Sequence, residues 1–244
     1  MPVTLDSPLS WETPTPDNLK MLDGLQPNIL KAHVREVLTV LFLRFDQAAR
    51  GKAFLKALAS GAKPLVKSAR THLTEIRDFK ATGKPGTAYV GVGLTAAGYT
   101  ALGIAAARQP SNPPFRSGMK ADTLGDPDPA TWDAHYRGTI HAVVLVGDQL
   151  QAPHDAALAK VRGLIGTGIT VLGQENGRGR HNANGDGIEH FGYVDGRSQP
   201  LFLKEDIREE TLGADGTSTW NPRFAPNRAI VPDPAAPDPA HDFG

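Results

Sequence analysis

The chain has 244 residues, a length that suits one large domain or two small ones. Lysine and arginine together number 26, as do aspartate and glutamate, so the formal net charge of zero indicates neither nucleic acid nor an anionic membrane as a partner. Cysteine is absent, which excludes disulfide bonds, thiolate catalysis and cysteine-based metal sites.

The N-terminal residues lack the pattern of a signal peptide. They begin MPVTLDSPLSWETPTPD, without a basic stretch before an apolar run, so we expect no signal peptide and a cytoplasmic location. No segment reaches the roughly 18 consecutive apolar residues of a membrane span. Because residues 1–24 are rich in Pro, Asp, Ser and Thr, they predict an N-terminal arm rather than a packed element.

The first half of the chain alternates between strand-like and helix-like segments. Residues 34–45 are apolar on both faces for most of their length, which predicts a central buried strand. Residues 47–60 carry apolar side chains at helical spacing. Residues 73–79 suggest a short strand, and residues 87–94 a glycine-containing one. Thr95 is then expected to cap a helix that runs to about residue 107.

The second half repeats the alternation after an irregular stretch at residues 110–129. A strand is predicted at 141–146, an amphipathic helix at 155–165 and a strand from 168 to 173. This order favours an α+β fold in which a ferredoxin-like antiparallel sheet packs with helices, although the pattern alone also permits a doubly wound parallel sheet. We therefore expect one domain over residues 25–211, followed by an irregular segment at 212–244 that contains several Asp-Pro pairs.

Two glycine-containing motifs imitate ligand sites without completing them. Residues 91–96 satisfy G-x-G-x-x-A, but no strand that ends in an acidic residue follows about 20 residues later, as a dinucleotide site requires. Residues 182–187 resemble the start of a calcium loop, but its twelfth position is Tyr193 instead of a glutamate. The structural interpretation of residues 91–96 is a tight strand-to-helix turn, and that of residues 182–187 is a solvated loop.

The remaining candidates are histidines, serines and one carboxylate. None of the eight histidines belongs to a close ligand pair, so no metal-ligating set is expected, although His190 could form a hydrogen bond within a site. No serine lies in a G-x-S-x-G elbow. Asp195 stands between Gly192 and Gly196 in GYVDGRSQP, where it could shape a hairpin or act chemically.

The segment around Asp195, EHFGYVDGRSQP, resembles the GxxDG signature of the dye-decolorizing peroxidase family. Three more segments are similar to that family: residues 25–45, the loop FRSGM with the LGDP that follows it, and residues 221–234. The resemblance thus covers most of the chain, and the GxxDG block is its most specific part. It implies a fold of two ferredoxin-like halves that hold haem b between them.

The resemblance assigns roles to the residues of the signature. Asp195 corresponds to the distal aspartate, the acid/base that promotes cleavage of hydrogen peroxide before small organic reductants are oxidised. Gly196, Arg197 and Ser198 correspond to the stretch that lies along the haem. A homo-oligomer is compatible with this family membership.

In such peroxidases the proximal histidine and the distal arginine belong to the second half, and the chain ends at Gly244, before that region. We therefore expect the C-terminal half of the same protein, as a second chain, to complete the haem site, since half of a haem cleft would leave a large apolar face exposed. The alternative function is a non-catalytic α+β binding or assembly domain in which the Asp-Gly turn is structural.

Overall fold

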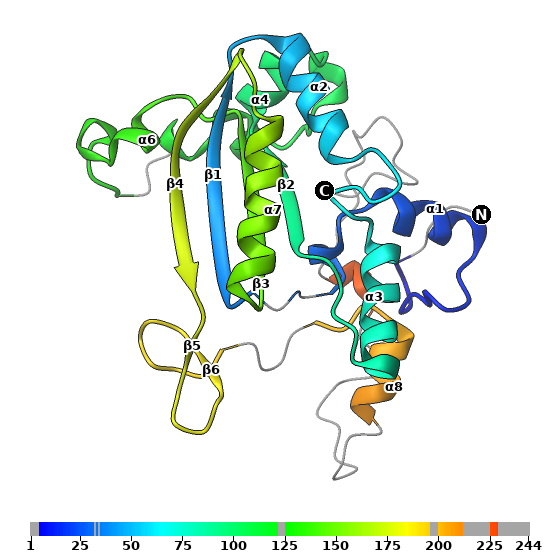
Figure 1. The fold of residues 1–244 in the computed structure, drawn as a ribbon. Coiled ribbons are helices and arrows are strands. Elements are labelled where there is room, and N and C mark those ends of the chain that lie inside the picture. Colours follow the sequence, from blue (N-terminus) through cyan, green and yellow to red (C-terminus); the bar gives the residue numbers. More distant parts are fainter. Residues whose placement is uncertain are drawn as a thin grey trace.

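The computed structural model describes residues 5–31, 33, 35–121, 125–195, 200–211 and 225–228. Its centre is a four-stranded antiparallel sheet with the strand order β2-β3-β1-β4. The strands are β1 (Val37–Phe45), β2 (Tyr89–Leu94), β3 (Ala142–Asp148) and β4 (Ile169–Arg178) (Figure 1). With helices between β1 and β2 and between β3 and β4, this order is ferredoxin-like. The predicted α+β class and the central place of the first strand are confirmed.

One face of the sheet is buried beneath helices. The principal helices here are α2 (Ala48–Leu58) and α7 (Gln151–Leu164), and α7 runs along the sheet (Figure 1). Alternate side chains of β1 point into this layer, because successive residues of a strand face opposite sides. The resulting core cluster includes Leu41, Leu43, Phe45, Phe54, Leu58, Val90, Val144, Val146 and Val161.

The opposite face of the sheet is only half-buried. It is formed by the alternate residues of the same strands, among them Leu38, Val40, Phe42, Val143 and Leu145. At one end it is covered by α6 (Ala134–Arg137), whose His135 stacks on Phe42 and whose Tyr136 meets Phe42 edge to face. The sheet is thus apolar on both faces, but within the described residues only one face has a continuous helical cover.

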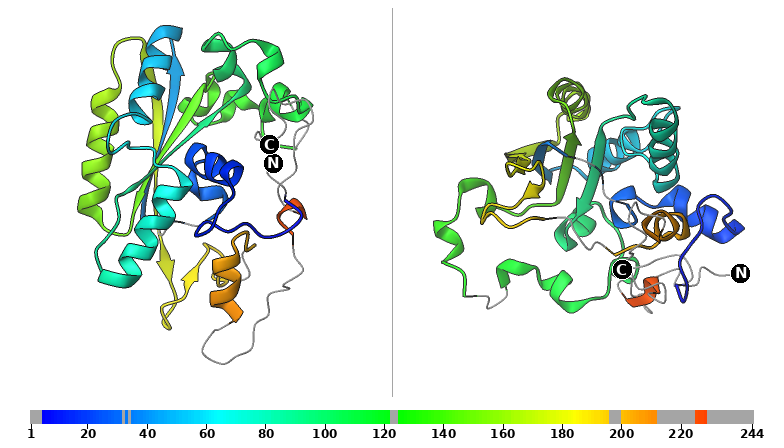
Figure 2. Two further views of the ribbon diagram at one scale, coloured as in Figure 1. Left: turned by 90° about the vertical axis from the view of Figure 1, so that its right-hand side faces the viewer. Right: turned by 90° about the horizontal axis from the view of Figure 1, so that it is seen from below.

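The N-terminal residues differ from the predicted arm, since residues 5–24 are packed. Thr15 caps α1 (Pro16–Gly24), and this segment joins α3 (Ala69–Thr82) and the residues just before α8 (Lys204–Thr211) around a second apolar cluster. Its buried members include Leu5, Leu9, Met21, Leu22, Leu73, Phe202 and Leu203. Figure 2 shows α1 and α8 well away from α7. The expectation was wrong because these leucines are buried by contacts distant in sequence.

Two further expectations need correction. Residues 73–79 form part of α3 instead of a strand, because Ser68 caps a helix whose buried residues, Ala69, His72 and Leu73, have helical spacing. The helix capped by Thr95, α4 (Ala96–Ala101), is also shorter than expected. It ends before Gly103, whose φ of 68° is left-handed.

Short elements fill the rest of the described chain. Turns of 3-10 helix are η1 (Pro27–Ile29), η2 (Ala106–Arg108), η3 (Met119–Ala121), η4 (Pro129–Thr131) and η5 (Pro226–Arg228), and α5 spans Pro113–Ser117. The two-residue strands β5 (Arg180–His181) and β6 (Gly187–Ile188) form a separate ladder after β4. None of the described helices combines the length and apolar content that crossing a bilayer would require.

The edge of β2 is closed by a side chain. The amide of Gln26 donates to the carbonyl of Val92 at 2.8 Å and accepts from its backbone N–H at 2.8 Å. A glutamine thereby takes the part of a neighbouring strand at this residue. We expect Gln26→Leu to lower the free energy of unfolding by about 2 kcal/mol, because both groups of Val92 lose a partner where water is partly excluded.

Urea denaturation at pH 7 measures the effect of Gln26→Leu. Gln47→Leu is the matched control, since the exposed Gln47 precedes α2 without a side-chain capping bond, and we expect a change within about 0.5 kcal/mol. Equal effects of the two variants would contradict a structural role for the Gln26 amide.

A buried ion pair links α3 to the start of β2. Lys67, which is 2% exposed, donates to Glu75 at 2.5 Å and to the carbonyl of Thr87 at 2.7 Å. Burial by itself would raise the pKa of Glu75, but the hydrogen bond and charge of Lys67, with help from Thr87, hold it below its ordinary value. The Glu75 contribution to stability is therefore present at neutral pH and is lost as the pH falls through the lowered pKa.

We expect Glu75→Gln to reduce the free energy of unfolding by about 2 kcal/mol at pH 7, since it removes a charged acceptor from a buried ammonium group. The difference from wild type should shrink below about pH 4.3, the ordinary pKa of glutamate, as the native carboxyl becomes protonated. Urea denaturation at a series of pH values measures this. In the exposed pair of Glu12 and Arg208, Glu12→Gln should cost less than about 0.5 kcal/mol at any pH.

Candidate active site

Asp195 lies on a small meander of three short extended segments within residues 180–195, which continues from the C-terminal end of β4. Arg180 of β5 pairs with Ile188 of β6, and Ile188 forms an antiparallel bridge with Val194. The backbone N–H of Asp195 then donates to the carbonyl of Gly187 at 3.0 Å. Asp195 is therefore connected through backbone pairing to β5 and β6, which follow the end of β4 (Figure 1).

The first turn of the meander is closed by its own side chains. The side-chain oxygen of Asn182 accepts from the backbone N–H groups of Asn184 and Asp186, each at 2.9 Å. Its side-chain nitrogen donates to the carboxylate of Asp186 at 2.9 Å. These contacts explain the Asn- and Gly-rich segment as a structural turn, and no cluster of potential metal ligands occurs among the residues that the structure describes.

The second turn brings the signature residues to the surface. Gly192 has a φ of 90°, a left-handed conformation that favours glycine, and its N–H donates to the carbonyl of Glu189 at 3.0 Å. The side chains of Phe191 and Tyr193 are 85% and 72% exposed. Asp195 is also exposed. A carboxylate thus stands beside two large apolar side chains that the described residues do not cover.

His190 belongs to this turn and has a partner across the meander. An Arg180 guanidinium nitrogen lies 3.3 Å from its Nδ1. Because a guanidinium only donates, Nδ1 is the acceptor and lacks a proton in this contact. Arg180 was not anticipated as a site residue; the Asn-Gly turn at 182–185 was the signal that would have placed it opposite Ile188.

The other residues of the predicted site fall outside the described part of the chain. These are Gly196, Arg197 and Ser198, which the resemblance assigned to the cofactor. The structure therefore places Asp195, His190, Phe191 and Tyr193 on one exposed segment of the meander, and their placement relative to the cofactor residues stays a prediction.

A shallow pocket of about 590 Å³ lies at the opposite end of the sheet, beside α4. Arg116 and His141 are its charged or titratable lining residues. The guanidinium of Arg116 donates to the carbonyls of Pro110 and Ala106, and His141 Nδ1 accepts the backbone N–H of Phe45 at 2.9 Å. Burial lowers the pKa of His141. These groups serve the packing of the loop, and we do not place the reaction there.

The glycine motif beside this pocket has a structural explanation. Gly91 lies beneath the ring of Tyr89, since a Cβ there would be 2.3 Å from the Tyr89 hydroxyl oxygen. Gly98 touches β3 so closely that a Cβ would be 1.9 Å from the His141 carbonyl oxygen. Gly91 in β2 and Gly98 in α4 thus allow close packing around an antiparallel sheet, in keeping with the structural interpretation of the motif.

Comparison with known proteins identifies the family. Residues 25–181 match the model of the DyP dimeric alpha+beta barrel domain. A multifunctional dye peroxidase, DyP2 of Amycolatopsis sp., is 52% identical over 246 residues, which cover 100% of this chain and 52% of that protein. A dye-decolorizing peroxidase of Mycena epipterygia is 32% identical over 187 residues, covering 75% of this chain and 33% of the relative.

Solved structures agree with this assignment. DyP2 from Amycolatopsis sp. superposes with a TM-score of 0.87 at 51% identity, covering 99% of this chain and 51% of that chain. A DyP-type peroxidase of Anabaena sp. gives a TM-score of 0.82 at 29% identity, covering 94% of this chain and 51% of the other. The chain spans about half the length of these relatives. By its matched domain and its sequence identity, the chain belongs to the dye-decolorizing peroxidase family.

Proposed function

We propose that the protein containing this chain is a haem-dependent peroxidase that uses hydrogen peroxide to oxidise dyes, phenols and other one-electron donors. The observation that carries the proposal is Asp195, a carboxylate beside exposed apolar side chains in a chain that matches a dye peroxidase along its whole length. Asp195 is the distal acid/base in this proposal.

Haem b is the proposed cofactor, and the described residues suit it. Phe191 and Tyr193 offer apolar surface next to Asp195, which a flat apolar macrocycle would remove from water. Gly196, Arg197 and Ser198 are the proposed contacts with the cofactor. When bound, haem supplies the redox-active iron that accepts the oxidising equivalents of peroxide.

Asp195 moves one proton in this mechanism. Its ionised carboxylate takes the proton from one oxygen of hydrogen peroxide and returns it to the other oxygen. The bond between the two oxygens breaks, and the oxygen that received the proton leaves as water. One group thus serves first as general base and then as general acid. The backbone bond from Asp195 to Gly187 fixes the main chain during both transfers.

The second half of the protein is the proposed partner of this chain. The relatives are about twice as long, and the face of the sheet that contains Val40, Phe42 and Leu145 is only half-buried. In the proposal, residues 25–211 form the first ferredoxin-like half, and residues 212–244 lead toward the second. The C-terminal half, as a second chain, contributes the proximal ligand and encloses Asp195.

We expect Asp195→Asn to lower the rate constant for reaction with hydrogen peroxide by about 10²- to 10⁴-fold, because an amide cannot accept and return the proton. Stopped-flow absorbance at the haem band measures this rate. Substrate oxidation after the peroxide step should change less than the peroxide step itself.

Asp186→Asn is the control for Asp195→Asn. It makes the same chemical change on the same meander and keeps an acceptor oxygen for Asn182, so we expect no change in the peroxide rate. An unaltered rate in Asp195→Asn would rule out Asp195 as the acid/base.

The need for the second half is tested by haem binding. We expect the 244-residue chain alone to give no stable Soret band when mixed with haem, and an equimolar mixture with the C-terminal half to give one, since the proximal ligand belongs to that half. Absorbance titration measures binding, and mass spectrometry of the purified protein shows whether a second chain accompanies the first. A complete protein that takes up no haem would favour the non-catalytic binding or assembly domain.

A further inference from the structure

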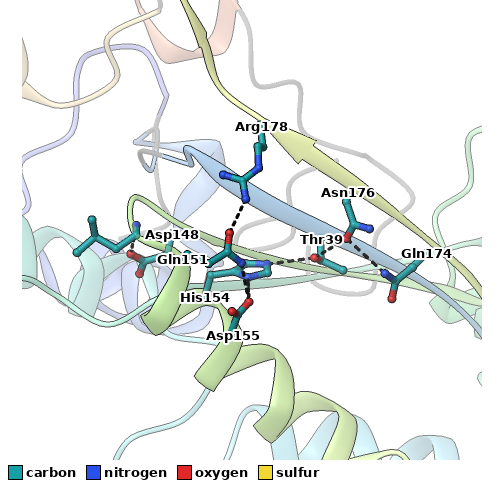
Figure 3. Close-up of polar contacts among 9 residues, drawn as sticks. Thr39, Asp148, Gln151, His154, Asp155, Gln174, Asn176 and Arg178 are labelled. Carbon is teal, nitrogen blue, oxygen red and sulfur yellow. Dashed lines mark hydrogen bonds and ion pairs between the residues drawn. The ribbon is translucent and has the colours of Figure 1, made fainter.

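A chain of polar side chains joins the first turn of α7 to β1 and β4 (Figure 3). At its centre is His154, which is 3% exposed and lies on the helical side of the sheet. Its Nε2 is 3.1 Å from the hydroxyl oxygen of Thr39, and its Nδ1 is 2.9 Å from a carboxylate oxygen of Asp155. Thr39 itself is 2% exposed, so water does not readily substitute for these contacts.

The directions of the hydrogen bonds can be followed from one end of this network of polar side chains. Arg162 can only donate, and it donates to the side-chain oxygen of Gln174. The nitrogen of Gln174 is therefore the group that faces the side-chain oxygen of Asn176, at 3.4 Å. That same oxygen lies 2.9 Å from the Thr39 hydroxyl, which must donate to it.

This leaves the oxygen of Thr39 as the acceptor toward His154. The Nε2 of His154 must then carry a proton to form its bond with Thr39. The direction of each bond follows from the one before it, and Arg162 fixes the first.

The hydrogen bonds at the other end of this polar network lead to the same His154 ring. Arg178 donates to the side-chain oxygen of Gln151 at 2.7 Å, so the nitrogen of Gln151 donates to Asp155, also at 2.7 Å. An exposed aspartate is ionised at pH 7, well above its ordinary pKa of about 3.9, so the Asp155 carboxylate only accepts. The Nδ1 of His154 must therefore carry a proton as well.

The charges around the ring differ in sign. The first turn of a helix is the positive end of its dipole and disfavours a cation, and Arg162 on α7 and Arg178 on β4 add positive charge. Asp155 on α7 offsets this directly, and Asp148 at the end of β3 accepts the backbone N–H of Leu150 at 2.9 Å. From β1, the Thr39 hydroxyl is the group that faces the ring.

The chain of bonds lies next to the part of β4 from which the meander starts. Asn176 and Arg178, which it holds, are near the C-terminal end of β4. Directly after them, the N–H of Gly179 donates to the carbonyl of Glu36 at 2.9 Å, and Arg180 pairs with Ile188. The direction in which β4 ends therefore sets the direction of the meander that carries Asp195.

We propose that His154 is a buried imidazolium whose two ring protons tie α7 to β1 and β4, and that it is thereby a positioning residue for the meander of Asp195. Loss of either ring proton removes a hydrogen bond of His154, either to Thr39 or to Asp155. The link to catalysis rests on the proposed function of Asp195, whereas the assignment of the ring protons does not.

The ring protons are tested by ¹⁵N NMR of the histidine-labelled full-length protein at pH 7, with the His154 signals identified by their absence in His154→Gln. We expect the two ring nitrogens of His154 to have the nearly equal shifts of an imidazolium. In Thr39→Val, which removes the acceptor of Nε2, we expect the widely separated pair of a neutral ring. A separated pair in the wild-type protein would overturn the proposal.

The positioning role is tested by amide hydrogen exchange over residues 180–195. We expect Thr39→Val to speed exchange there about tenfold, as the loss of one buried hydrogen bond should. Thr170→Val is the matched control, because Thr170 lies on β4 but bonds to Asp46, at the end of the strand far from the meander. Asn176→Asp retains an acceptor for Thr39 and should leave both the ring shifts and the exchange as in wild type. If exchange is unchanged in Thr39→Val, the positioning role is wrong.

The catalytic consequence is read from the pH profile of the peroxide reaction. We expect Thr39→Val to slow the reaction about fivefold at both pH 5 and pH 7, because valine removes the acceptor of Nε2 whatever the protonation state of the ring. A wild-type rate in Thr39→Val at both pH values would contradict the positioning role. If Asp195→Asn leaves the rate unchanged while the ring shifts and exchange behave as expected, the proposed function fails and the assignment of His154 stands.

Discussion

The fold depends on a central strand that is apolar on both faces. Leu41 and Leu43 of β1 are fully buried beneath the helices, while Val40 and Phe42, which alternate with them, are only half-buried on the other side. A strand of this kind needs a layer on each face to remove its side chains from water. The described residues of this chain supply one continuous helical layer. The other face of the sheet needs a second layer, and this need relates the fold to that of its longer relatives.

Polar contacts determine how the apolar layers are aligned. Hydrophobic burial is not directional and would tolerate small shifts of α7 along the sheet. The bonds from His154 to Thr39 and from Gln151 to Arg178 are directional, and they fix the helix at a single place along β1 and β4. The buried ion pair of Lys67 and Glu75 has a similar effect where α3 leads toward β2. The core thus provides the driving force, and a few polar groups select the arrangement.

Local patterns in the sequence predicted much of the sheet and less of its surroundings. The strands β1 and β3 are nearly continuous apolar runs and α7 carries apolar side chains at helical spacing, so all three were anticipated. The helix α3 was missed in part because its buried face contains His72 and offers little apolar contrast. The packing of Leu5 and Leu9 depends on Leu203, far along the chain, and no local pattern contains that contact. The Asp195 motif was visible as a resemblance, but its neighbour Arg180 required the register of the meander. His154 looked like any scattered histidine, because Thr39 stands 115 residues before it.

The glutamine at the edge of β2 has a consequence for self-association. An exposed strand edge offers unpaired backbone groups to any extended chain, including a second copy of the same protein. Gln26 already occupies both backbone groups of Val92, so an incoming strand would have to displace an intramolecular partner at that residue. Within the described residues, β4 is the other outer strand of the sheet. Lateral growth of the sheet by strand addition is therefore disfavoured on the β2 side, where Gln26 opposes aggregation through this edge.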